Sequence, residues 1–294
     1  MQELMKAKAQ EMLSNGSVTR VLAWKKGDFE TNPEPAFFTK HVDDMVYNQY
    51  CATNLSNFMV GVEKEEGKTL VFLKPCDTFS FNQLLKENRI SRDKAYIIGV
   101  GCEGVKVIDE MQETGALLEK CNVCTKIKHM VYDELIGEDV TRRVTDDPLT
   151  RFKDIEAIEK MDAGERFAFW QGEFSKCIRC NACRNACPPC GCKKCVFDND
   201  NYDTAQKANV TTFEEQMFHI IRAYHVAGRC TDCGECTRVC PQDIPLHLLN
   251  RKFIKDINAL YGEFQAGADI ETLGPLTDFN IDQDAEPSIV YDRG

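Results

Sequence analysis

A cysteine motif occurs twice in the second half of the chain. Both copies have the spacing C-x2-C-x2-C-x3-C-P, ending at Pro188 and Pro241. Together they contain eight cysteines: Cys177, Cys180, Cys183, Cys187, Cys230, Cys233, Cys236 and Cys240. Two-residue gaps allow one loop to present three thiolates to three corners of an iron–sulfur cubane, while the fourth cysteine points away. The duplicated spacing therefore predicts two [4Fe–4S] clusters.

The fourth cysteine of each copy is expected to ligate the cluster of the other copy. Cluster one would then use Cys177, Cys180, Cys183 and Cys240, and cluster two would use Cys187, Cys230, Cys233 and Cys236. The alternative is a zinc-binding interaction module, because C-x2-C pairs also bind zinc. Zinc normally requires two such pairs per site, whereas this chain repeats a triplet with a remote fourth cysteine. Iron–sulfur binding is therefore favoured.

Four cysteines in the first half of the chain could bind a third [4Fe–4S] cluster. Cys121 and Cys124 form a C-x2-C pair, and Cys76 and Cys102 each follow an apolar run of strand length. Because sites in parallel α/β domains lie at the carboxyl ends of strands, this placement favours a cluster. The alternative is two core cysteines with a redox or zinc pair, since buried free cysteines are common.

Three more cysteines, Cys190, Cys192 and Cys195, follow the first motif closely. They are one short of a cubane, and Cys51 could supply the fourth thiolate, so that the sixteen cysteines would form four sets of four. A further metal site here and packing of these thiols beside a cluster are both open interpretations.

A glycine motif surrounds one of the predicted ligands. Gly99, Gly101 and Gly104 match G-x-G-x-x-G after a strand-like run, a pattern that can hold the phosphate of FAD, FMN or a dinucleotide at a helix N-terminus. The acidic residue expected about 20 positions later is missing. We therefore favour glycines that let the backbone approach a cluster bound at Cys102 and offer N–H groups to its sulfurs. Flavin binding is the alternative.

Composition limits the class of protein. The chain has 294 residues and a net charge of −11, which suits two modest domains and argues against binding nucleic acid or anionic membranes. No apolar run approaches the roughly 20 residues of a membrane span, and the first residues lack the apolar stretch of a signal peptide. A secreted disulfide framework is therefore not expected, and we predict a cytoplasmic metal-binding protein.

Charge around the first cysteine motif differs from the acidic average. Five basic residues and no acidic one occur between positions 176 and 195: Lys176, Arg179, Arg184, Lys193 and Lys194. Such a group would raise the reduction potential of a cluster or receive an acidic redox partner. Solvated side chains on a loop are the alternative.

Strand and helix patterns alternate in the first half of the chain. Apolar runs at 18–24, 69–73 and 94–100 have strand character, 79–88 has helical spacing, and 105–113 is expected to be a helix. This alternation predicts an α/β domain with a parallel sheet.

The second half has helical patterns. One helix is expected to end near Gly228 and a second to extend from Pro245 to Gly262. One face of the first helix is apolar: Phe213, Met217, Ile220, Ile221 and Tyr224. Cysteine motifs framed by helices predict an α-helical ferredoxin-like dicluster domain. We divide the chain into an α/β domain (1–165), the ferredoxin-type domain with two clusters (166–265) and an acidic extended tail (266–294).

The motifs together resemble known proteins. Lys74-Pro75-Cys76-Asp77, the stretch 97–104 and the C-x2-C pair that follows are similar to the beta subunits of coenzyme F420-reducing hydrogenases and formate dehydrogenases. The stretch 175–250 resembles dicluster ferredoxin domains of the heterodisulfide reductase type. The resemblance covers most of residues 60–275.

This resemblance implies an iron–sulfur electron-transfer subunit of a cytoplasmic oxidoreductase complex in an anaerobe. Its partners would be a flavoprotein, hydrogenase or dehydrogenase subunit, and a carrier such as ferredoxin. It also implies that the N-terminal cluster is held by four cysteines: Cys76, Cys102, Cys121 and Cys124. A flavin-containing reductase of a deazaflavin or nicotinamide carrier is the second hypothesis.

Overall fold

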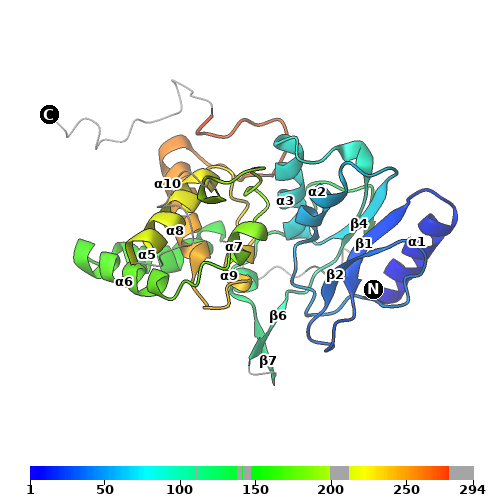
Figure 1. The fold of residues 1–294 in the computed structure, drawn as a ribbon, viewed down its shortest axis with the longest axis horizontal. Helices are drawn as coiled ribbons and strands as arrows, with labels where there is room; N and C mark the ends of the chain where they lie inside the picture. The colour runs from blue at the N-terminus through cyan, green and yellow to red at the C-terminus, as the bar shows by residue number, and fades with distance from the viewer. Residues whose placement is uncertain (110–111, 138–140, 142–146, 199–211, 278–294) are drawn as a thin grey trace. The chain divides into compact units, whose positions relative to one another are not determined.

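The computed structural model describes residues 1–109, 112–137, 141, 147–198 and 212–277. Internal contacts divide the chain into two units, shown in Figure 1. Unit 1 contains Met1–Pro148 with Gly267–Ile270, and unit 2 contains Leu149–Ala266 with Glu271–Gly294. The sequence division at residue 165 stays a prediction. Most of the predicted acidic tail, from residue 278 on, lies outside the described residues.

Unit 1 is built on a six-stranded sheet with the strand order β2-β1-β4-β5-β8, and β3 also pairs with β1. The strands are β1 (Arg20–Lys25), β2 (Glu34–Phe38), β3 (Met45–Val46), β4 (Thr69–Leu73), β5 (Ala95–Val100) and β8 (Glu134–Ile136). The pairs β1–β4, β4–β5 and β5–β8 are parallel, whereas β2 and β3 run antiparallel to β1. The predicted α/β class is therefore confirmed for this unit.

Apolar sequence explains the centre of the sheet. Every residue of β4 is buried, and in β5 only Tyr96 is partly exposed, as expected for strands covered on both faces. The three strand predictions and the helix prediction at 79–88 are confirmed within a few residues. The helices of unit 1 are α1 (Gln2–Ser14), α2 (Met59–Val62), α3 (Pro75–Lys86) and α4 (Glu119–Asn122), with 3-10 turns η1 (Leu55–Phe58) and η2 (Arg92–Lys94).

The helix predicted at 105–113 is wrong. Two antiparallel strands, β6 (Lys106–Asp109) and β7 (Gln112–Leu117), occupy this region. Val105 precedes β6, and Val107 and Ile108 lie within it. Their β-branched side chains favour strands over helices. No helix therefore follows the glycine motif directly, so the helix N-terminus that would hold a phosphate there is missing.

Unit 2 contains only helices and 3-10 turns among its described residues. The helices are α5 (Lys153–Glu159), α6 (Ala163–Ser175), α7 (Ala182–Asn185), α8 (Thr212–Val226), α9 (Glu235–Arg238) and α10 (Leu246–Tyr261). The turns are η4 (Pro148–Phe152) and η5 (Val196–Asp198). Helices α8 and α10 match the two predicted helices, and each is followed by a glycine with positive φ, Gly228 and Gly262.

The apolar face predicted for α8 lies at the surface. Phe213, Met217 and Tyr224 are exposed, and Tyr224 packs its ring against Phe253 of α10 at 4.8 Å between centroids. The buried side of α8 instead carries both polar and apolar side chains: Glu215, Phe218, His219, Arg222 and Ala223. Within the described part of the chain, no helix has the length and apolar character needed to cross a bilayer.

Gly99 allows a test of the packing of β5. A Cβ at this position would lie 2.5 Å from Leu135 Cδ2 and 2.7 Å from His129 Cδ2. His129 is buried, with Nε2 within 3.1 Å of the Leu73 carbonyl oxygen and 3.2 Å of the Val100 carbonyl oxygen. We expect Gly99→Ala to lower the free energy of unfolding by about 1–3 kcal/mol, because the added methyl group displaces these neighbours.

Thermal unfolding under anaerobic conditions measures this effect. Gly61→Ala in α2 is the matched control, because nothing lies within 4 Å of its added Cβ and alanine favours a helix. Equal melting temperatures for the two variants would contradict the packing described for Gly99.

Candidate iron–sulfur sites

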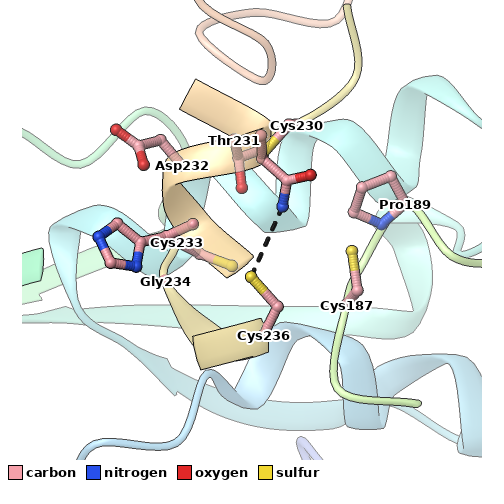
Figure 2. A pocket seen from close by; sticks show the side chains of 10 residues that line it. Cys187, Pro189, Cys230, Thr231, Asp232, Cys233, Gly234 and Cys236 are labelled. Atoms are coloured by element: carbon pink, nitrogen blue, oxygen red, sulfur yellow. Dashed lines mark hydrogen bonds between the residues drawn. The ribbon is translucent and has the colours of Figure 1, made fainter. Parts of the chain in front are cut away.

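Four cysteines from two separate loops line one pocket in unit 2 (Figure 2). Cys187 follows α7, Cys230 and Cys233 lie between α8 and α9, and Cys236 is on α9. These are the four thiols that the sequence groups for cluster two, including the cysteine that comes from the other copy of the motif.

The two copies of the motif have the same backbone conformation. Arg179 and Asn181 have φ of 54° and 62°, and the equivalent residues Asp232 and Gly234 have φ of 55° and 70°. The left-handed region is uncommon for residues other than glycine, so its repetition at matching positions indicates one shared loop geometry. A four-residue helix follows each loop, α7 in the first copy and α9 in the second.

The loop geometry directs backbone N–H groups at sulfur. The N–H of Arg179 donates to Cys177 Sγ at 3.4 Å, and the backbone of Asp232 makes the equivalent bond to Cys230. In the second copy, the buried Asn250 Nδ2 also donates to Cys236 Sγ at 3.6 Å, drawn as a dashed line in Figure 2. Hydrogen bonds to sulfur stabilise thiolates and tune the reduction potentials of iron–sulfur clusters.

The cysteines grouped for cluster one also come together. Cys183 is buried in a hydrophobic cluster of unit 2, and Cys177 and Cys240 pack against that cluster. Its thiol interacts electrostatically with those of Cys177, Cys180 and Cys240. Cys183 also interacts with Cys236, so the two sets of thiols are neighbours within the same core.

Burial determines whether these cysteines are thiols or thiolates in the absence of metal. Burial raises the pKa of Cys177 to about 12 and that of Cys183 to about 11, and it also raises the pKa of Cys230. A buried thiol therefore stays protonated unless a positive charge stabilises its thiolate. Bound iron supplies that charge, because metal ions deprotonate coordinating thiols. Donor type, convergence and burial thus fit [4Fe–4S] clusters.

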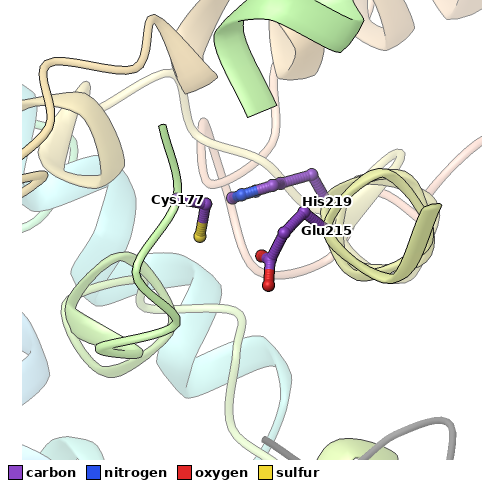
Figure 3. A group of neighbouring side chains, drawn as sticks. All are labelled: Cys177, Glu215 and His219. Carbon is purple, nitrogen blue, oxygen red and sulfur yellow. The ribbon is translucent and has the colours of Figure 1, made fainter. Parts of the chain in front are cut away.

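Two further side chains lie beside Cys177 (Figure 3). The ligand atoms of Cys177, Glu215 and His219 lie within 4.8 Å of one another. Glu215 and His219 are buried one turn apart on α8. Burial raises the pKa of Glu215, whereas burial and then the Arg222 and Arg179 guanidinium groups lower the pKa of His219 to about 3. His219 is therefore neutral near pH 7.

In unit 1, the four predicted ligands form a chain of neighbours. Electrostatic interactions connect Cys76 with Cys102, Cys102 with Cys121, and Cys121 with Cys124. Backbone N–H groups again meet sulfur: Gly104 donates to Cys102 Sγ at 3.4 Å, as the sequence led us to expect. Val105 donates to Cys121 Sγ at 3.4 Å. Cys76 and Cys102 follow the carboxyl ends of β4 and β5, Cys121 lies on α4, and Cys124 follows that helix.

A pocket of about 350 Å³ lies at the same end of the sheet in unit 1. It is lined by residues that follow β3, β4, β5 and β8: Tyr47, Cys51, Lys74, Gly101, Cys102, Gly104 and Gly137. Lys74 is 1 % exposed and pairs with Asp77 at 2.8 Å. Its Nζ also lies 4.3 Å from the centre of a Trp24 ring. Two of the predicted cofactor-binding glycines therefore line this pocket, whereas Gly99 packs against Leu135 and His129.

The remaining cysteines have different surroundings, and the further metal site expected from them stays a prediction. Cys190 hydrogen-bonds Cys187, which with the Arg222 guanidinium lowers the pKa of Cys190 to about 6. Cys192 is exposed, and Cys195 interacts with Arg184. Cys51 lies in unit 1, where the N–H of Asn48 donates to its Sγ at 3.4 Å.

The basic group predicted around the first motif is smaller than expected. Arg179 is buried, with its guanidinium 4.3 Å from the centre of the Phe218 ring. Lys176 pairs with Glu173 at 2.8 Å and Arg184 with Asp198 at 2.8 Å. These acidic partners lie just outside positions 176–195. Lys193 and Lys194 are the exposed members that remain.

Comparison with protein families defines the class. Residues 173–244 match the model of a 4Fe-4S dicluster domain. This stretch contains both copies of the cysteine motif. The prediction of a domain with two 4Fe–4S clusters is therefore confirmed at the level of the domain class. The chain is an iron–sulfur electron-transfer protein of the oxidoreductase type.

Two curated relatives specify the resemblance. The F420-dependent formate dehydrogenase subunit beta of Methanocaldococcus jannaschii is 24% identical over 357 residues, covering 92% of this chain and 92% of the relative. The F420-dependent formate dehydrogenase 1 subunit beta of Methanococcus maripaludis is 23% identical over 340 residues, covering 84% and 87%. The chain is therefore similar to these beta subunits along most of its length, as its motifs indicated.

Iron content tests the pocket in Figure 2. We expect Cys236→Ala to remove about four iron atoms and four sulfides per chain, because one buried corner ligand is lost. Cys192→Ala is the control, since Cys192 is exposed and outside the pocket. Anaerobic iron and acid-labile sulfide analysis measures both variants. Equal iron in the two variants would contradict the role assigned to the pocket.

Proposed function

We propose that this chain is the iron–sulfur electron-transfer subunit of a multi-subunit oxidoreductase complex of an anaerobe. One observation supports this most strongly: thiols from two motif copies, distant in sequence, line a single pocket in a loop geometry that occurs twice. Cluster one is held by Cys177, Cys180, Cys183 and Cys240, and cluster two by Cys187, Cys230, Cys233 and Cys236. All eight ligands belong to the α-helical ferredoxin-like domain that we assign to residues 166–265.

The chain's own residues bind and tune the clusters in this function. Thiolates hold the iron, backbone N–H groups and Asn250 donate to sulfur, and burial limits solvent access. The clusters supply one-electron chemistry, so no general acid or base is required. Because Cys183 of one set interacts with Cys236 of the other, the arrangement favours electron transfer between the two clusters.

The α/β domain at 1–165 extends this relay with a third [4Fe–4S] cluster, held by Cys76, Cys102, Cys121 and Cys124. Its support is the chain of neighbouring thiols and the N–H donors from Gly104 and Val105. Cys190 is a supporting residue beside cluster two, because its thiol hydrogen-bonds that of Cys187, and a further metal site that also uses Cys192 and Cys195 stays a prediction.

The names of the relatives support the partners that we propose. Each is named a beta subunit, which supports assembly with other subunits, such as a flavoprotein, hydrogenase or dehydrogenase subunit. Ferredoxin is the carrier that we expect to exchange electrons with the complex. We expect the cytoplasm as its location, because this many metal-binding thiols require a reducing compartment.

The second candidate function is a flavin-containing reductase of a deazaflavin or nicotinamide carrier. The pocket of about 350 Å³ in unit 1 favours it specifically, because the pocket combines open volume with Gly101, Gly104 and a buried lysine. Both relatives are named F420-dependent, and coenzyme F420 is a deazaflavin. FAD or FMN would occupy this pocket in such an enzyme.

Cluster number and electron transfer test the relay. Protein purified anaerobically should contain about eight iron atoms per chain from two clusters, or about twelve if unit 1 holds the third. When reduced ferredoxin is mixed with the oxidised protein under anaerobic conditions, the ferredoxin should become oxidised and the clusters of this protein should become reduced. Cys121→Ala should lower the iron content by about four and leave the clusters of unit 2 reducible. Stoichiometric zinc without sulfide would support an interaction module instead and contradict the relay.

Flavin content distinguishes the two candidate functions. The anaerobic protein is denatured and any released flavin is quantified by its fluorescence. Less than about one flavin per ten chains after incubation with excess FAD or FMN supports the relay alone. One flavin per chain, with reduction of added deazaflavin, would establish the second function.

A further inference from the structure

Arg222 is a buried cation in the core of unit 2. The residue is 4% exposed and lies on the inner side of α8. Its Nη1 lies 4.0 Å from Cys190 Sγ. Within the part of the chain that the structure describes, its Nε has no hydrogen-bond partner. Among the described residues, no carboxylate forms an ion pair with it. A buried guanidinium without a negative partner is unfavourable, so some compensating charge is required.

The other buried arginines of unit 2 have such partners. Arg251 pairs with Asp232 at 2.8 Å, and Arg179 lies 3.9 Å from a Glu215 oxygen. Both pairs bring a carboxylate into the core together with the guanidinium. Arg222 differs from them, because the groups around it are thiols.

The thiols around Arg222 belong to both proposed clusters. Its guanidinium interacts electrostatically with Cys236, Cys187, Cys183 and Cys190, in decreasing order. Cys183 belongs to the ligand set of cluster one, and Cys187 and Cys236 belong to that of cluster two, where Figure 2 shows them facing the same pocket. The positive charge is therefore adjacent to ligands of both sets.

We propose that Arg222 sets the reduction potentials of both clusters by holding a fixed positive charge beside their ligands. This inference rests on the proposed function, because the clusters must be bound to have potentials. A [4Fe–4S] cluster with four thiolates is negatively charged, and reduction adds one electron without making or breaking a bond. A nearby positive charge therefore stabilises the reduced form more than the oxidised form, which raises the potential.

Redox titration of the full chain followed by EPR spectroscopy tests this role. We expect Arg222→Gln, with full iron content, to lower the midpoint potentials of both clusters in unit 2. The ratio of reduced to oxidised cluster at a fixed potential should fall at least tenfold, which corresponds to about 59 mV for a one-electron couple. Arg222→Lys retains the charge and should restore most of the wild-type potentials.

Lys160→Gln is the matched control. It removes the same charge from the same unit, but Lys160 is exposed, so water and salt screen its field at the clusters. Its potentials should equal those of the wild type. A merely structural role for Arg222 would change stability without this difference between the two variants.

The possible outcomes separate this inference from the proposed function. Unchanged potentials in a fully loaded Arg222→Gln protein overturn the role of Arg222 and leave the clusters established. Wild-type protein without iron and sulfide overturns the proposed function itself. If Arg222→Gln does not retain clusters, Arg222→Lys decides: wild-type iron and potentials support the charge, whereas loss of clusters there too contradicts it.

Discussion

Keeping sulfur negatively charged inside a small helical unit is the constraint on which the rest of unit 2 depends. Burial raises the pKa of Cys177, Cys183 and Cys230, so these thiols would be neutral without compensating charge. Iron supplies most of that charge in the proposed clusters. The protein adds backbone N–H groups, the Asn250 amide and the buried guanidinium of Arg222, whose neighbours are thiols. The loops must therefore point N–H groups inward, which the repeated positive φ values achieve.

This constraint also explains why α8 has an unusual distribution of side chains. A helix that covers a hydrocarbon core would bury Phe213, Met217 and Tyr224, yet these side chains are exposed. The inner side instead presents Glu215, His219 and Arg222 to a core that contains thiols. Polar side chains are favoured there because the interior carries charge. The hydrophobic pattern alone therefore identifies the helix but not the side of it that is buried.

The sequence predicted the elements whose signals are local. The strand β4 is an uninterrupted apolar run, and the cysteine spacing groups the thiols that line the pocket in Figure 2. The helix expected at 105–113 failed because β-branched residues outweigh the weak helical spacing there. Asn250 and Arg222 had no local signal, since each lies on a helix far in sequence from the cysteines it meets.

The same limits apply to charge. The basic group around the first motif looked continuous in sequence, but Glu173 and Asp198 compensate two of its members and burial removes a third. Pairing with residues beyond a sequence window can only be seen in three dimensions. In unit 1, conversely, the glycine at position 104 was expected to offer its N–H to sulfur, because the ends of parallel strands bring loops together.

The central claim is that two cubane clusters share interleaved ligands and therefore lie close together. The EPR spectrum of the fully reduced protein tests it most directly, because neighbouring paramagnetic clusters couple magnetically. The account predicts signals broadened by spin–spin interaction, which sharpen to those of an isolated cluster when Cys187→Ala removes cluster two. Two independent, uncoupled signals, or no cluster signal at all, would contradict it.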